Sequence, residues 1–213
     1  MKSRFIGLQR DRLDALVDAV YAIALTMLVL DVKLPLANGG FGGSYILHEL
    51  VPKLVAYGIA FATVALCWVG HYYFSTVVRY TDYIHVILNL VPLAFVALVP
   101  FPAAALGTYP DSSLAVAAYA SNAMIISLLY LVNWRFVRHL IPQNVGRRLL
   151  AHIGAAIWLL VILEGSALAL AFVKPVLGIG MAAAVIPFGF TAVGLLAPRI
   201  VRAHGVIESQ VET

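Results

Sequence analysis

Charged side chains are scarce in this 213-residue sequence, since only 11% of residues are Asp, Glu, Lys or Arg while 62% are hydrophobic. Soluble domains carry about 25% charged residues, so this composition indicates a membrane protein. The single cysteine, Cys67, excludes an intrachain disulfide. The sequence shows no paired metal-ligand spacing, nucleophile elbow or phosphate-binding loop, so we expect no enzyme, no cofactor and no metal site.

Long runs without charge divide the chain into six candidate membrane spans. Residues 54–78, 83–110, 112–134 and 175–198 contain no Asp, Glu, Lys or Arg. Residues 13–30 contain only Asp14 and Asp18, and residues 149–173 contain only Glu164. A membrane helix needs about 17–25 mostly apolar residues, and continuous runs favour helices over a barrel. We predict an all-α membrane protein with one domain (1–203), a short polar tail (204–213) and helices at 12–34, 49–78, 82–107, 112–139, 148–173 and 175–200.

Lys and Arg are distributed unequally between the two sides of this predicted topology. With both termini in the cytoplasm, the other side holds only three of the 14 basic residues, Lys33, Lys53 and Lys174. This distribution follows the positive-inside rule. Because the basic residues are divided among positions that flank the membrane, we expect the lipid bilayer as a partner and no nucleic acid.

The first predicted helix has a charged side and an apolar stripe. At about 100° per residue, Leu16, Ile23, Met27 and Leu30 share one stripe, whereas Asp18 points about 140° away from Ile23. A carboxylate in hydrocarbon is costly and needs partners in the protein. We therefore expect the Asp18 side to face the subunit's own helices, and the stripe to face either lipid or further copies of the helix. Several copies around an axis would enclose a pore.

His71 and Asn89, on the second and third predicted helices, are placed at the depth of Asp18. A rise of about 1.5 Å per residue puts all three residues about 9–12 Å inside the cytoplasmic helix ends. Trp68 lies one turn from His71 on the same helix face. This spacing predicts a polar cluster of Asp18, His71 and Asn89 covered by Trp68, and the alternative is that the groups meet only through an accident of packing.

These residues resemble the transmembrane protein 175 family of potassium channels, in its prokaryotic form with one six-helix repeat. That family begins its first helix with Arg, three residues and Phe-Ser-Asp, and here Arg12 is followed by three residues and Leu16-Val17-Asp18. Residues 18–35 continue the likeness, as does the segment 67–102 with its Trp-x-x-His and Pro-Phe-Pro landmarks. The later helices follow the family mainly by pattern.

The resemblance implies a homotetramer in which the first helix of each subunit lines a central pore without a carbonyl filter. It assigns the narrowest point to Ile23, further apolar rings to Met27 and Leu30, and a role in ion selection to Thr26. It also implies a polar network behind the pore, which corresponds here to Arg12, Asp18, Trp68, His71 and Asn89. The sequence departs from the family at Leu16 and Val17, so the family's serine hydroxyl next to Asp18 is missing.

We therefore expect a passive, potassium-permeable cation channel with an apolar constriction that gates by dewetting. The potassium ion is its permeant species, and we expect no soluble protein partner. The resemblance places the channel in the plasma membrane of a prokaryote as a multi-pass protein. The alternative is a proton channel, or a proton-coupled transporter of small solutes, that uses the intramembrane groups of Asp18, His71 and Glu164.

Overall fold

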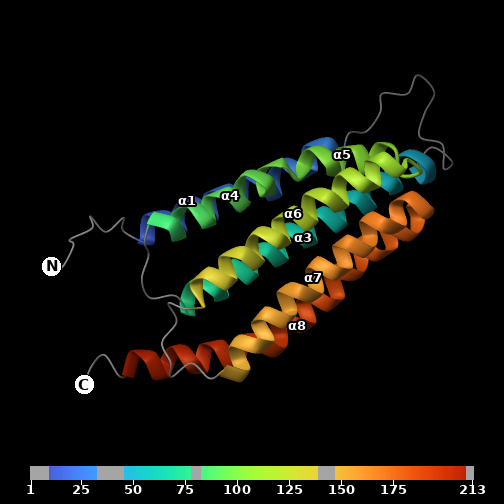
Figure 1. The fold of residues 1–213 in the computed structure, drawn as a ribbon. Helices are drawn as coiled ribbons and strands as arrows, with labels where there is room; N and C mark the ends of the chain where they lie inside the picture. Colours follow the sequence, from blue (N-terminus) through green and yellow to red (C-terminus); the bar gives the residue numbers. More distant parts are fainter. Residues whose placement is uncertain (1–9, 33–45, 78–82, 139–146, 210–213) are drawn as a thin grey trace.

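The computed structural model of the protein describes residues 10–32, 46–77, 83–138 and 147–209. Within these ranges the regular structure is helical and contains no strand. The long elements are α1 (Arg10–Met27), α3 (Val51–Val77), α4 (Tyr83–Leu98), α5 (Pro100–Thr108), α6 (Ser113–Val137), α7 (Arg147–Val173) and α8 (Pro175–Ser209). Figure 1 shows them as an elongated bundle in which α1 packs against α4, α4 against α6, α6 against α7, and α7 against α8.

In the described part of the chain, six helical segments are long and apolar enough to cross a membrane, which confirms the predicted fold. They are Arg12–Asp31, His48–Tyr73, Val86–Thr108, Ser113–Val137, Arg147–Val173 and Pro175–Arg202. An even number of crossings returns the chain to its starting side. Accordingly, the beginning of α1 and the end of α8 lie at the same end of the bundle (Figure 1).

The helix ends differ from the sequence expectation in three places. The predicted helix 82–107 is divided into α4 and α5, because Pro100 lacks a backbone donor and restricts the residue before it. The first and second spans include short irregular turns, η1 (Leu28–Asp31) and η2 (Ile46–Leu50). Helix α8 continues to Ser209, past its predicted end at residue 200 and into the predicted tail. Pro198 lies inside α8 and does not end the helix, since a proline can kink a helix without stopping it. Residues 33, 34, 78, 82, 139 and 210–213 of the predicted helix ends and tail lie outside the described residues.

The closest helix packing joins α6, α7 and α8. Ala167 and Ala171 of α7 are fully buried, and both contact the start of α8 at Gly178. A Cβ atom added to Gly178 would lie 2.9 Å from Cγ1 of Val116 and 3.0 Å from the carbonyl oxygen of Ala167. Small residues therefore let three membrane helices approach one another here, as is common in membrane proteins.

Candidate functional site on the first membrane helix

Helix α1 is fixed to the bundle by one narrow face. Val17, Tyr21, Ala24 and Leu28 are at most 2% exposed, and their spacing of three or four residues places them on one side of the helix. They belong to the main hydrophobic core, and α1 packs there against α3 and α4. Roughly half of the circumference of α1 is left outside this contact.

The predicted apolar stripe lies on this uncovered part of α1. Leu16, Ile23, Met27 and Leu30 are 48%, 58%, 46% and 63% exposed. In a membrane protein, such a stripe faces either lipid or another protein chain. The stripe is thus available for contact with further copies of α1.

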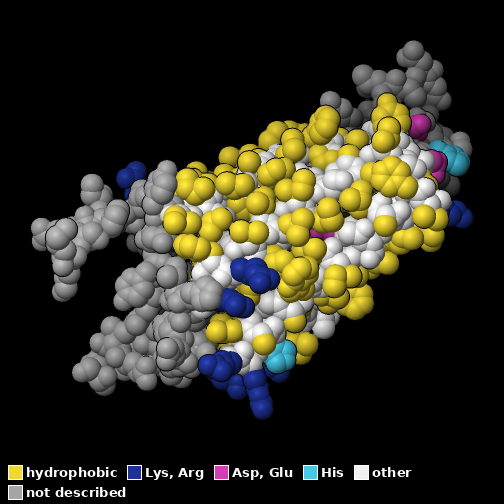
Figure 2. Space-filling view, viewed as in Figure 1, with side chains coloured by type: hydrophobic (Ala, Val, Ile, Leu, Met, Phe, Trp, Pro, Cys, Tyr) yellow, Lys and Arg dark blue, Asp and Glu magenta, His cyan; other side chains and the backbone are white. Residues whose placement is uncertain are grey.

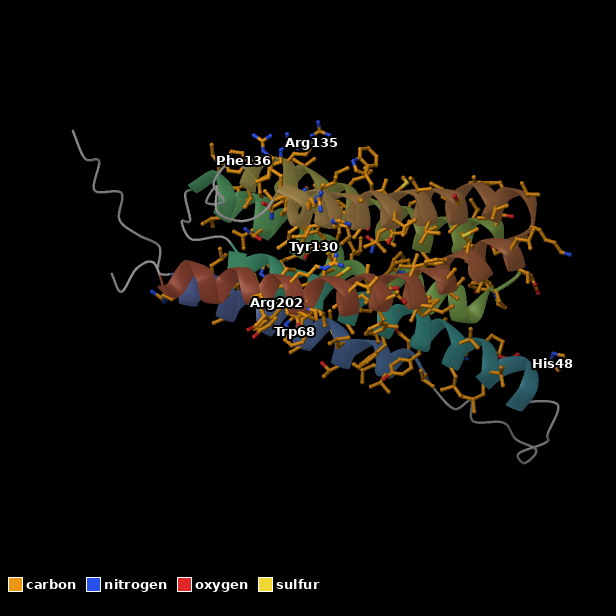
Figure 3. The ribbon with its side chains drawn as sticks, turned by 90° about the horizontal axis from the view of Figure 1, so that it is seen from below. His48, Trp68, Tyr130, Arg135, Phe136 and Arg202 are labelled. Carbon is orange, nitrogen blue, oxygen red and sulfur yellow. The ribbon has the colours of Figure 1, made fainter. Side chains whose placement is uncertain are left out.

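Asp18 is also exposed, which corrects the expectation that its side of α1 is enclosed by the subunit. Its carboxylate accepts a hydrogen bond of 2.9 Å from Nε1 of Trp68 in α3. Trp68 is itself 38% exposed and lies along α1 (Figure 3). The buried face is instead the apolar one that includes Val17 and Tyr21, because burying apolar surface is favourable whereas desolvating a carboxylate is costly.

The other members of the predicted cluster are buried and have additional partners. His71 is 8% exposed, and its ring centroid lies 6.5 Å from that of Tyr21 in α1. Asn89 is 3% exposed, and its Oδ1 accepts a hydrogen bond of 3.2 Å from Nδ2 of Asn133 in α6. The structure therefore places Asp18 with Trp68 at the surface, whereas His71 and Asn89 lie in the interior.

Sequence reasoning missed Tyr21, Tyr130 and Asn133. The hydroxyl groups of Tyr21 and Tyr130 hydrogen-bond to each other and so connect α1 with α6. Figure 3 shows Tyr130 between the helix layers. Asn133 is fully buried. A polar side chain within a membrane span was the one signal for this residue that the sequence offered.

Two further predicted residues lie on the uncovered side of α1. Arg12 is exposed in the first turns of the helix. Thr26 is also exposed, and its hydroxyl donates to the carbonyl oxygens of Ala22 and Ile23 at 3.0 Å and 2.9 Å. The hydroxyl of Thr26 is therefore directed at the backbone of its own helix.

Glu164 of α7 lies in the interior, far from α1 in sequence and only 5% exposed. Its carboxyl group lies beside Ser127 of α6, a neighbour that sequence reasoning did not find. Among the described residues, no three His, Cys, Asp or Glu side chains come together in a way that would hold a metal ion.

Among the described residues, basic side chains gather near the ends of helices α1, α6, α7 and α8. Arg12, Arg135, Arg138, Arg147 and Arg148 lie at the end of the bundle where α1 begins, whereas Lys53 and Lys174 lie at the other. Figure 2 shows Lys and Arg near the ends of the molecule and a broad hydrophobic surface between them. Lys2, Arg4, Lys33 and Arg79, which the predicted topology also uses, lie outside the described residues.

Comparisons with known proteins point to one family. Residues 12–100, which include α1, Trp68, His71 and Asn89, match the sequence model described as "Endosomal/lysosomal potassium channel TMEM175". The crystal structure of a lysosomal potassium-selective channel TMEM175 homolog from Chamaesiphon minutus superposes with a TM-score of 0.72 and 26% identity, covering 85% of this chain and 97% of that one. This chain is similar to the TMEM175 family over residues 12–100 and in its fold.

Relatives within the TMEM175 family carry channel names. A potassium channel from Streptomyces collinus is 35% identical over 127 residues, or 58% of this chain and 62% of that protein. The endosomal/lysosomal proton channel TMEM175 of Bos taurus is 37% identical over 101 residues, or 44% of this chain and 21% of that protein. The match thus spans less than two thirds of these relatives. These names agree with the expectation that the chain is not an enzyme.

Proposed function

We propose that this protein is a subunit of a potassium-permeable cation channel, in which α1 helices from four copies line a central pore. The supporting observation is that the uncovered side of α1 carries an apolar stripe and, next to it, the carboxylate of Asp18. Lipid covers apolar side chains well but leaves a charged group without compensation. A second copy of the chain satisfies both requirements, and the names of the bacterial relatives support a potassium channel.

In this proposal Ile23 forms the constriction, with Met27 and Leu30 as further apolar rings toward the other end of the helix. Water and ions are unstable in a narrow apolar passage, so conduction requires the passage to widen. Thr26 lies among these residues on the exposed side and is the candidate for a role in ion selection, but we expect that role to be small because its hydroxyl bonds to the backbone of α1. No resident cofactor is needed, because the potassium ion only passes through.

The polar residues around α1 position the helix in the proposed channel. The hydrogen bond between Asp18 and Trp68 ties the back of α1 to α3 at a surface that the neighbouring subunit covers. His71 supports α1 from inside the subunit through Tyr21, and Asn89 links α4 to α6. Arg12, exposed at the start of α1, is available to a neighbouring subunit.

We place the channel in the plasma membrane of a prokaryote, with both termini in the cytoplasm. The grouping of arginines at the end of the bundle where α1 begins supports this orientation. The bacterial sources of the potassium-channel relatives support the location.

Potassium flux from liposomes tests this function. We expect the purified protein to release loaded potassium passively and faster than sodium. Ile23→Asn should wet the constriction, raise the flux about 10-fold or more and weaken the preference for potassium. The matched control is Ile162→Asn on α7, because Ile162 is 59% exposed and Ile23 is 58% exposed. Equal effects of the two substitutions would exclude Ile23 from the pore.

Proton conduction is a second candidate, favoured by the names of the vertebrate relatives. Asp18 and His71 are both titratable and both adjoin α1, through Trp68 and Tyr21 respectively. A pH-sensitive dye inside the liposomes separates the two functions. Acidification driven by a pH gradient without potassium, and its loss in His71→Phe, would favour the proton channel.

A further inference from the structure

A cavity of about 150 Å³ lies inside the subunit between α3, α6, α7 and α8. Most of its walls are aliphatic or aromatic, and it is partly open to the surface. An apolar cavity of about this size accommodates a benzene ring. None of its lining residues belongs to α1, so the cavity is separate from the proposed pore.

The carboxyl group of Glu164 is part of the cavity wall. Glu164 is 95% buried, because only 5% of the residue is exposed. Ser127 adjoins the carboxyl group, and among the described residues Oε2 has no hydrogen-bond partner. A buried polar oxygen without a partner costs free energy, and a donor brought by a ligand would remove that cost.

Neighbouring hydroxyl groups in the wall are already engaged. The hydroxyl of Thr63 donates to the carbonyl oxygen of Ile59 at 2.9 Å and accepts from Tyr119 at 3.0 Å. The hydroxyl of Tyr130 bonds to Tyr21. These two hydroxyl groups are thus occupied, and a ligand that enters the cavity can supply the donor that Oε2 of Glu164 lacks.

The remaining walls favour a positively charged ligand. Four aromatic side chains line the cavity, namely Tyr73, Tyr130, Trp134 and Phe188. Aromatic faces attract cations, most strongly where water is excluded. No Lys or Arg is among the lining residues, and the other ionisable groups there are His71, Cys67 and the two tyrosines.

We propose that this cavity binds a small apolar ammonium ion. Its N–H group donates to Oε2 of Glu164, and its hydrocarbon or aromatic part packs against the apolar walls. A bare metal cation fits the site poorly, because one carboxylate and one hydroxyl supply too few oxygen ligands. The site lies next to the proposed pore helix, since Tyr130 and His71 line the cavity and both contact Tyr21 of α1.

Fluorine NMR with the protein in lipid nanodiscs tests this site, using 2-(4-fluorophenyl)ethylammonium as the probe. We expect saturable binding to the unmodified protein. The neutral analogue 2-(4-fluorophenyl)ethanol should bind about 10-fold more weakly or worse, because it lacks the charge-assisted hydrogen bond. Glu164→Gln keeps the size of the side chain and should weaken binding of the ammonium probe by a similar factor.

A second pair of variants tests the cavity itself. Ala192→Phe places a ring in the cavity and should abolish binding, whereas Ala169→Phe adds the same ring to an exposed position of α7 and should leave binding unchanged. If Glu164→Gln does not fold, this pair of variants still tests whether the ammonium probe binds in the cavity. Equal binding of the two probes, or retained binding in Ala192→Phe, would overturn the proposal. Absence of saturable binding to the unmodified protein would also overturn it and would indicate that water fills the cavity.

Discussion

Helices α1 and α7 are both poorly covered by the rest of the chain, but their exposed sides differ in chemistry. In the membrane window of each helix, 28% of the residues in α1 and 17% in α7 are buried. From residue 155 to 173 the exposed residues of α7 are all apolar: Ala155, Trp158, Leu159, Ile162, Ala169, Phe172 and Val173. The exposed side of α1 instead includes Asp18 and Thr26 within its apolar residues. Exposure alone therefore does not distinguish the proposed pore helix from a helix that faces lipid, whereas the exposed carboxylate of Asp18 supports the proposal for α1.

The two helices also supply matched controls. Ile23 and Ile162 are almost equally exposed, and Trp68 and Trp158 are 38% and 46% exposed. An exposed position on α7 can thus be changed in the same way as its counterpart on or beside α1. Each difference in outcome then reports the environment of the side chain rather than its size.

The largest expected difference concerns access of water. In a Cys67→Ala background, Ile23→Cys should react with a water-soluble cationic thiol reagent at least about 10-fold faster than Ile162→Cys, because water reaches the constriction whenever it widens and the reactive thiolate forms only where water is present. Modification is followed by mass spectrometry of the protein in liposomes. Similar rates at the two positions would place both helices against lipid.

The next effect concerns the contact of Gly178 in α8 with the buried side of α7. Gly178→Ala should destabilise the protein by about 1–3 kcal/mol, because the new Cβ would overlap Val116 and the backbone of α7. Thermal unfolding in detergent measures this change. Gly180→Ala is the control, since a Cβ atom there has no neighbour within 4 Å. The control should be neutral or stabilise by up to about 1 kcal/mol through helix propensity. Equal stability of the two variants would contradict the close packing of α6, α7 and α8.

A smaller effect is expected from the indole group beside α1. Trp68→Phe removes the hydrogen bond to Asp18 and should lower stability by about 1 kcal/mol, a value reduced from that of a buried bond because the pair is partly exposed. It should also ease dissociation of the oligomer on heating, as followed by native gel electrophoresis. Trp158→Phe should change neither property by a measurable amount. If Trp68→Phe changes neither the stability nor the dissociation of the oligomer, the hydrogen bond does not hold α1 in place.

The smallest effect is expected at Thr26. Its hydroxyl already bonds to the backbone of α1, so Thr26→Val should change stability by less than about 0.5 kcal/mol and the potassium-to-sodium permeability ratio by less than about twofold. Reversal potentials in planar bilayers give this ratio. A large loss of selectivity would show that the hydroxyl turns toward the permeating ion.

The sequence predicted the six spans because uncharged runs of membrane length are a strong local signal. It also predicted the apolar stripe of α1, because helical periodicity places Ile23 and Met27 on one side. It did not predict which side of α1 is buried. That choice depends on how Val17 and Tyr21 fit against α3 and α4, which is a matter of packing between distant segments.

The polar contacts in the interior could not be predicted from the sequence for the same reason. To predict the hydrogen bond between Asn89 and Asn133, one must know the register of α4 against α6. To predict that Ser127 lies beside Glu164, one must know the register of α6 against α7. Depth along each helix can be counted from the sequence, but the rotation of one helix relative to another cannot. This explains why residues of similar predicted depth are divided between the surface and the interior.

The hydroxyl contact between Tyr21 and Tyr130 limits how the first helix can move. Because it joins α1 to α6, the most enclosed helix of the bundle, α1 cannot turn about its own axis without either breaking this bond or carrying Tyr130 along. In the proposed channel, opening by rotation of α1 alone would therefore have an energetic threshold, whereas opening by tilting whole subunits would leave the bond intact. The second motion keeps each protomer rigid and confines the rearrangement to the surfaces between protomers.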